Sequence, residues 1–242
     1  MTTITERNTL KSKIKKYEGH YEHLYSDLSG GLTIGEGHLV ENLIAAQKLD
    51  FRHKSDGRKA TKNEIKDEYN AVLQLYHSSK LNAQNTGERF NLAATGYSDV
   101  TKLKLFPAYI NELTDKHIQN FEYDLKNLYG AVKFNNFPTD VRLAVFDMSF
   151  NLGITKLRTL FPTFNRYILA KNWSGAARES HRKDIAEERN VYVHDLLKKS
   201  ARSEKVKKLA ELARKAQLAK KAQLAREKAK RLARLSRISP IL

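Results

Sequence analysis

The sequence predicts a mainly helical α+β protein with a small N-terminal β-hairpin and a basic helical tail. Residues 21–34 hold two short strand-like runs separated by Ser29-Gly30-Gly31, which is typical of a hairpin. Most of the chain after residue 60 shows helical periodicity instead. Residues 203–236 contain neither Gly nor Pro and are rich in Ala, Leu, Lys and Arg, which favours a long helix.

An amphipathic helix is expected over residues 9–17, just before the hairpin. Gly19 follows where a helix end favours a left-handed residue, so Glu18 should project from that end. Asp27 closes the first predicted strand and Thr33 lies in the second. A helix-end acid facing a hairpin that carries a second carboxylate is the layout of a glycosidase cleft.

The rest of the chain is predicted to be helical, with one long interruption. A short helix is expected over residues 40–50, and Thr61 and Glu64 form a capping box that opens a helix with its apolar side chains spaced through residue 76. Residues 78–105 have no sustained period and are expected to form a long loop or a small subdomain. Further helices are expected to begin near residues 114, 139, 162 and 173.

Around the hairpin the chain resembles the phage-type lysozymes of glycoside hydrolase family 24. The family pattern is a Glu, eight residues, an Asp, five residues, a Thr and then a Gly-His pair; Glu18, Asp27, Thr33, Gly37 and His38 meet it without an insertion. An isolated Glu-Asp-Thr spacing arises often by chance, but the joint match is specific. The alternative is an ordinary polar hairpin with a helix-capping Glu, which gives no reason for the joint match.

The resemblance implies a lysozyme-like two-lobed fold. A small N-terminal β-hairpin lobe, a long linking helix and a helical C-terminal lobe would form a catalytic domain over residues 1–197, and residues 198–242 would form the basic helical tail. The match is firm over residues 12–40 and looser over 113–190. Relative to small family members, the chain carries an insertion at about residues 48–112.

Catalytic roles follow from the charge that develops during cleavage of a glycosidic bond. Glu18 is the candidate general acid that protonates the leaving oxygen. Asp27 would be ionised, either holding a water for attack or acting as the nucleophile. Thr33 is uncharged and cannot be the base, but its hydroxyl can orient that water beside Asp27.

The resemblance implies further roles outside the catalytic set. Leu39 and Phe150 would line the sugar cleft; for each, an ordinary core position is an equally good interpretation. His38 would form a structural ion pair with Asp124, and a role for His38 as the catalytic base is the minority interpretation.

Composition narrows the chemistry. The chain has 242 residues, 40% of them apolar, and no cysteine, so neither disulfides nor thiol catalysis enter. The histidines lack zinc-ligand spacing, and there is neither a phosphate-binding glycine loop nor a nucleophilic Ser elbow. We therefore expect no metal and no cofactor. The charged N-terminal stretch predicts synthesis in the cytoplasm without a signal peptide and action on the bacterial cell wall after release or delivery by another route.

The net charge of +17 is concentrated in the tail. Residues 198–242 hold sixteen Lys or Arg and three Glu, while the rest of the chain is nearly balanced. A solvated basic helix is one interpretation; binding to anionic envelope polymers or a membrane surface is the functional one. Nucleic-acid binding would be adventitious, and an appended engineered segment is a further alternative.

The leading hypothesis is a muramidase that cleaves the β-1,4 bond between N-acetylmuramic acid and N-acetylglucosamine in peptidoglycan and so lyses bacteria, as a monomeric endolysin or antibacterial toxin domain. A lytic transglycosylase is the close alternative, because that chemistry proceeds with one acid and consumes no water. A non-catalytic lysozyme-like protein that binds envelope or nucleic acid through its tail belongs to a different class.

Overall fold

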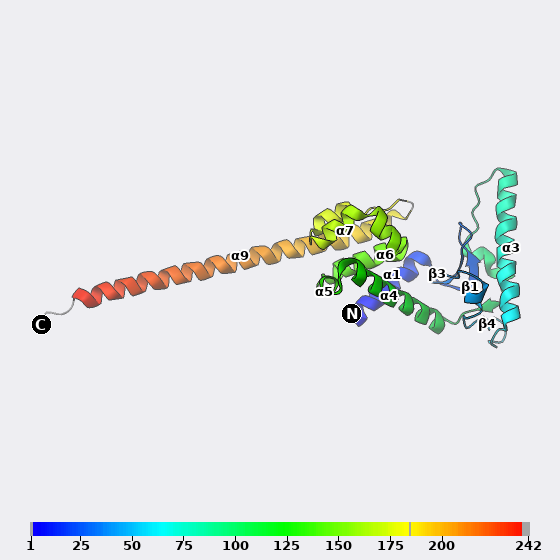
Figure 1. The fold of residues 1–242 in the computed structure, drawn as a ribbon, viewed down its shortest axis with the longest axis horizontal. Coiled ribbons are helices and arrows are strands. Elements are labelled where there is room, and N and C mark those ends of the chain that lie inside the picture. Colours follow the sequence, from blue (N-terminus) through cyan, green and yellow to red (C-terminus); the bar gives the residue numbers. More distant parts are fainter. Residues whose placement is uncertain (1, 184, 239–242) are drawn as a thin grey trace. The chain divides into compact units, whose positions relative to one another are not determined.

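The computed structural model of the protein describes residues 2–183 and 185–238, the last four of these as backbone only (Figure 1). Within this range the fold is mainly helical α+β, with a small antiparallel sheet near the N-terminus followed by about ten helices that end in a long one. The chain divides into two compact units. The first holds the residues up to Asn136 together with Val145–Thr155, and the second holds Phe137–Ala144 and the chain from Lys156 onward.

The first unit contains the sheet, residues 48–112 and the longest helices that precede the tail. Its elements are α1 (Ile4–Glu18), β1 (Tyr21–Ser26), β2 (Leu32–Gly35), β3 (His38–Leu39), α2 (Leu43–Ala46), β4 (Arg52–His53), α3 (Lys62–Thr86), the 3-10 helix η1 (Ala94–Val100), β5 (Leu103–Lys104), α4 (Pro107–Tyr129) and α5 (Ala131–Asn135).

The predicted N-terminal helix is confirmed, and it begins earlier than expected. A capping box formed by Thr3 and Glu6 starts α1 at Ile4, and the helix buries Leu10 and Ile14. It ends at Glu18 as predicted, where Gly19 adopts a φ of 81° and donates its N–H to the Lys15 carbonyl at 3.1 Å. The first turn was not predicted, because it is mostly polar and the prediction relied on the spacing of apolar residues.

The predicted hairpin is confirmed, with a third strand added. β1, β2 and β3 form an antiparallel sheet in that order, with Tyr25 opposite Thr33 and Thr33 opposite Leu39. Leu32 and Ile34 are buried in the hydrophobic core. Because side chains alternate along a strand, Tyr25, Thr33 and Leu39 lie side by side on the other face.

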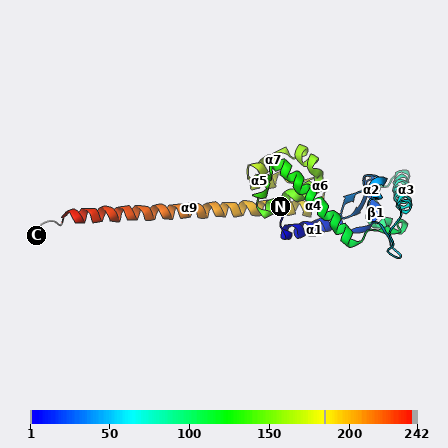
Figure 2. The ribbon, with the colours of Figure 1, turned by 60° about the horizontal axis from the view of Figure 1, so that its bottom comes forward.

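Residues 48–112 complete the core under this sheet. The capping box of Thr61 and Glu64 opens α3 as predicted, and Ile65, Val72 and Tyr76 pack into one cluster with the buried residues of the sheet. Both views place α3 beside β1 (Figures 1 and 2). Residues 78–105 were expected to form a long loop or a small subdomain; the loop expectation was wrong for the first part, because α3 continues to Thr86.

The second unit is helical. A helix that spans both units, α6 (Thr139–Leu160), is kinked at Gly153, whose φ is 73°. The elements that follow are α7 (Pro162–Leu169), α8 (Trp173–Arg178) and α9 (Glu187–Ile238).

The boundary expected at residues 197/198 falls inside a continuous helix. α9 begins at Glu187, and its side chains at Val193, Leu197 and Ser200 are buried. From Lys205 to Arg234 its side chains are exposed. The expected tail of residues 198–242 is thus the outer part of α9, except that residues 239–242 lie outside the described chain. No helix of the described residues is both long and apolar enough to cross a membrane.

Candidate functional site

Glu18 lies on the first unit at the junction of α1 and the sheet. α1 is tied to α4 by Arg7 and Lys11, whose side chains contact the Asp115 carboxylate at 3.4 and 2.6 Å. A Cβ atom at Gly37 would lie 3.4 Å from Glu18 Cγ and 3.6 Å from its Oε2. The Glu18 side chain is therefore packed directly over the turn between β2 and β3.

Asp27 is held by the hairpin turn that it begins. Its Oδ1 atom accepts hydrogen bonds from Ser29 N at 2.8 Å, Ser29 Oγ at 2.6 Å and Gly31 N at 2.8 Å. Among the described residues no donor contacts Oδ2. One oxygen thus orients the carboxylate, and the other is available to a water or a substrate.

Glycine is required at position 31 because of this carboxylate. A Cβ atom there would lie 2.9 Å from Asp27 Oδ2 and 3.2 Å from Leu39 Cδ1. Asp27 and Leu39 therefore meet over the Gly31 backbone. Leu39 is 53% exposed, which is unusual for a leucine that packs beside a carboxylate and agrees better with a ligand-facing position than with a core position.

Thr33 is in the same row of side chains. It is 7% exposed, and its Oγ1 donates weakly to the Gly31 carbonyl at 3.3 Å. Its cross-strand neighbours are Tyr25 and Leu39. The hydroxyl therefore lies beside the turn that carries Asp27, as a water-orienting role needs.

Tyr25 links the two acids, and sequence reasoning missed it. Burial raises the pKa of its phenol, and the negative charge of Glu18, with further contributions from Tyr21 and Asp27, raises this pKa more. The phenol consequently stays protonated and can donate a hydrogen bond. Glu18 packs against Gly37, and Asp27 meets Leu39 only two residues further along the chain, so both carboxylates lie against the β2–β3 segment whose Thr33 pairs with Tyr25.

The expected pairing of His38 with Asp124 is not what the structure contains. His38 Nδ1 lies 2.7 Å from His117 Nε2, and within the described chain no ion pair joins His38 to Asp124. The physical reason is position along α4: His117 precedes Asp124 by two helical turns, about 10 Å along the axis, and it is the turn with His117 that meets β3.

The histidine pair is electrically neutral at physiological pH. Burial lowers the pKa of His38 to about 4, assisted by the neighbouring His117 and Lys116, and burial also lowers the pKa of His117. One ring must donate and the other accept in this contact. A base poised near neutrality is therefore not found at His38, which supports its structural interpretation.

Phe150 packs on α4 beside this pair. Its ring centroid lies 5.4 Å from that of Phe121 and 6.5 Å from that of His117. The side chain is half-buried, so one part of the ring packs and the other stays accessible. Phe150 is therefore packed on one side, as a core residue is, and accessible on the other, as a residue lining a cleft is.

A second network holds the turn beneath Glu18, and it too was missed from sequence. Glu36, between Gly35 and Gly37, contacts His20 Nδ1 at 3.0 Å and accepts a hydrogen bond from Thr114 Oγ1 at 2.8 Å. The Glu36 side chain is only 9% exposed. The one available signal was a charged residue between two glycines in a strand-turn.

The assembled site contains two carboxylates, a protonated phenol, a threonine hydroxyl and an exposed leucine. Such a set can donate a proton to a leaving oxygen, stabilise positive charge and orient a water. Among the described residues, no group of three His, Asp or Glu side chains is arranged to hold a metal ion. In comparisons with known proteins, no family model and no curated protein matches the chain.

Proposed function

We propose that the protein is a muramidase that hydrolyses the β-1,4 bond between N-acetylmuramic acid and N-acetylglucosamine in peptidoglycan. The observation that carries this proposal is that Glu18, from a helix end, packs over the turn at Gly37, while Asp27, from the hairpin turn, meets Leu39 two residues further along the chain. Two carboxylates set in different environments around one site are the minimum that glycoside hydrolysis needs.

The roles follow from the contacts of each group. Glu18 is the general acid, because it ends helix α1, is packed over the turn at Gly37 and lies near the Tyr25 phenol, whose pKa its charge raises. Asp27 handles the water, because three hydrogen bonds converge on its Oδ1 and fix the orientation of the carboxylate. Its Oδ2 then meets the attacking water or the sugar cation, with the Thr33 hydroxyl beside it.

Glu18→Gln tests the proposal, because it removes the transferable proton while keeping the size of the side chain. We expect release of reducing sugar from purified peptidoglycan to fall by roughly 10²–10⁴-fold, the usual contribution of a general acid. Glu88→Gln is the matched control, since Glu88 is an exposed acid of the same unit that lies after α3. Full activity in the Glu18 variant would remove this residue from the mechanism.

The products separate hydrolysis from the transglycosylase alternative. Mass spectrometry should find reducing ends that carry the added water, because Asp27 and Thr33 are both present to handle that water. Anhydro sugars as the main product would assign the site to a lytic transglycosylase and would leave Asp27 without its proposed role.

The exposed basic part of α9, from Lys205 to Arg234, supports a second part of the proposal, that the protein contacts anionic polymers of the cell envelope. From Lys205 to Arg234 its side chains are exposed, with leucines such as Leu209, Leu218 and Leu224 at least half exposed and not gathered in one stripe. Contact with anionic envelope polymers is therefore electrostatic rather than a membrane insertion.

A further inference from the structure

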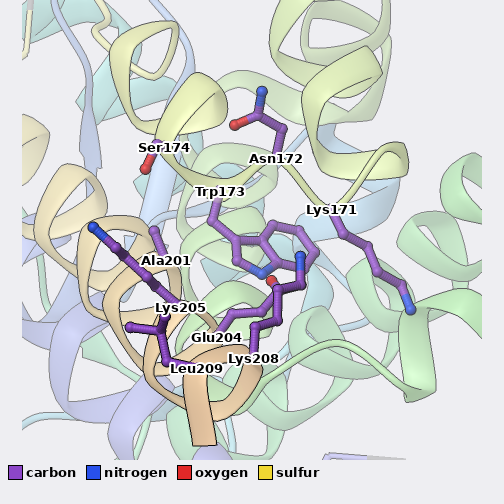
Figure 3. Close-up of a pocket in the computed structure, with 9 residues that line it drawn as sticks. All are labelled: Lys171, Asn172, Trp173, Ser174, Ala201, Glu204, Lys205, Lys208 and Leu209. Atoms are coloured by element: carbon purple, nitrogen blue, oxygen red, sulfur yellow. The ribbon is translucent and has the colours of Figure 1, made fainter. Parts of the chain in front are cut away.

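The second unit contains an open pocket of about 320 Å³ where the start of α8 meets α9 (Figure 3). Its lining includes three lysines, Lys171, Lys205 and Lys208, against one acid, Glu204. Glu204 is already paired with Lys208 at 3.2 Å, one helical turn away. The pocket therefore carries an excess of positive charge.

Trp173 forms the wall of the pocket, and its indole N–H has no hydrogen-bond acceptor among the described residues. The residue is 2% exposed, and its ring packs edge-on against Phe137 with centroids 5.6 Å apart. Its indole Nε1 is buried and has no acceptor among the described residues. An indole nitrogen can only donate, and a buried donor without an acceptor is unfavourable. Within the described part of the chain, this indole donor therefore has no acceptor.

Lys171 stands in a backbone conformation that lysine disfavours. Its φ is 55°, and it is the one non-glycine residue with positive φ in the described part of the chain. The position follows the end of α7, where Asn172 N donates to the Tyr167 carbonyl at 2.9 Å, a helix ending that usually takes glycine. Keeping a lysine there costs folding stability, which is typical of residues retained for a site.

We propose that this pocket binds a phosphoryl group of an anionic envelope polymer or lipid. A phosphoryl group combines multiple acceptor oxygens with one or two negative charges, so it can accept from the Trp173 indole and from the lysines together. The assignment of the phosphoryl group to an envelope component rests on the proposed function. The inference that the pocket binds an anion does not rest on it.

Two flexible side chains lie next to the Trp173 ring. Figure 3 shows Glu204 and Lys208 next to the Trp173 ring, with the ammonium groups of Lys171 and Lys205 extending to opposite sides. The Lys208 side chain is 72% exposed, so its contact with Glu204 is a weak surface ion pair. A phosphoryl group would compete with Glu204 for Lys208 and draw in the outer lysines.

The test uses the intrinsic fluorescence of Trp173, which is the single tryptophan of the 242-residue chain. The full-length protein is titrated with inorganic phosphate, glycerol 3-phosphate, a glycerol-phosphate polymer and vesicles of phosphatidylglycerol, each at constant ionic strength. We expect a saturable change with the phosphate compounds. A polymer response assigns the source to the envelope polymer, and a response to vesicles alone assigns it to the lipid head group.

Lys171→Gly supplies the decisive variant. Because glycine relieves the positive φ, the thermal midpoint should rise, while phosphoryl affinity should fall by about tenfold through loss of one charge-assisted contact. Lys133→Gln, at an exposed position of α5, is the matched control and should change neither. Trp173→Phe should abolish binding measured by calorimetry.

Two results would overturn the inference. One is the absence of any saturable response in the wild type, and the other is an affinity that Lys171→Gly leaves unchanged. The titrations are repeated in Glu18→Gln, so that failure of the muramidase proposal leaves this outcome intact and the two can be distinguished.

Discussion

At the scale of single residues, the neutral histidine pair makes stability depend on pH. The pKa of His38 lies near 4 in the folded protein and near 6.5 when it is unfolded. Between these values the unfolded chain binds more protons, so the free energy of unfolding should decrease as pH falls from about 6.5 to 4. Above that window the full contribution is present.

Urea unfolding across this range measures the effect. His117→Gln removes the neighbouring ring and should raise the pKa of His38 and flatten the pH dependence, while His77→Gln, at an exposed position, should leave it unchanged. An imidazole titration by NMR that places His38 at an ordinary pKa would contradict this account.

Substitutions at two glycines, Gly31 and Gly87, should separate an effect on activity from an effect on stability. Gly31→Ala pushes a methyl group against Asp27 Oδ2, at 2.9 Å, so we expect hydrolysis to fall by about 10²-fold with little change in thermal stability. Gly87→Ala meets nothing within 4 Å but must adopt a φ of 72°; it should lower the free energy of unfolding by ~1–2 kcal/mol and spare activity. The reverse pattern would sink our placement of Asp27.

At the scale of elements, Glu68 ties α3 to the start of β5. Its Oε2 atom accepts hydrogen bonds from Lys102 N at 2.6 Å and Leu103 N at 2.8 Å, and burial raises the pKa of its carboxyl. Glu68→Ala leaves these backbone donors without an acceptor and should cost about 1–3 kcal/mol per unsatisfied group. Asp67→Ala, at the exposed neighbouring position of α3, should stay within ~0.5 kcal/mol. Equal midpoints in urea for the two variants would contradict this role.

Element boundaries show where the sequence signal ends. α3 was predicted from its capping box and the buried Ile65, Val72 and Tyr76. Its last turns were missed because residues 77–86 are mostly exposed and carry no apolar period. α4 was placed at residue 114, yet it begins at Pro107, since proline is favoured in the first helical turn.

At the scale of the whole molecule, activity on isolated wall and contact with the envelope should be separable. A cut at residue 198 would remove the buried Ser200 and part of the Trp173 pocket, so the better truncation ends at Ala210. The removed segment holds ten Lys or Arg and two Glu. Hydrolysis of isolated peptidoglycan should persist, while binding to anionic vesicles should weaken and lose its salt dependence, because each basic residue near such a surface contributes about 1 kcal/mol.

Vesicle co-sedimentation at low and high salt and a wall-hydrolysis assay on the same preparations provide the measurement. If the truncated protein lost all hydrolysis, the outer part of α9 would belong to the catalytic machinery and this division would be wrong.

The sequence by itself determined the local features of the site. The order of Glu18, Asp27 and Thr33 around a helix end and a Gly-rich turn follows from capping and hairpin chemistry, which act over a few residues. For the same reason the helical character of the tail was predictable from propensity alone.

Only the tertiary structure decided which distant groups meet. That Glu18 packs over the turn at Gly37, that His38 contacts His117 rather than Asp124, and that an indole donor lies among lysines depend on packing between separate elements of the chain. Such contacts leave no periodic trace in the sequence, because burial and charge at a site are set by neighbours in space rather than along the backbone.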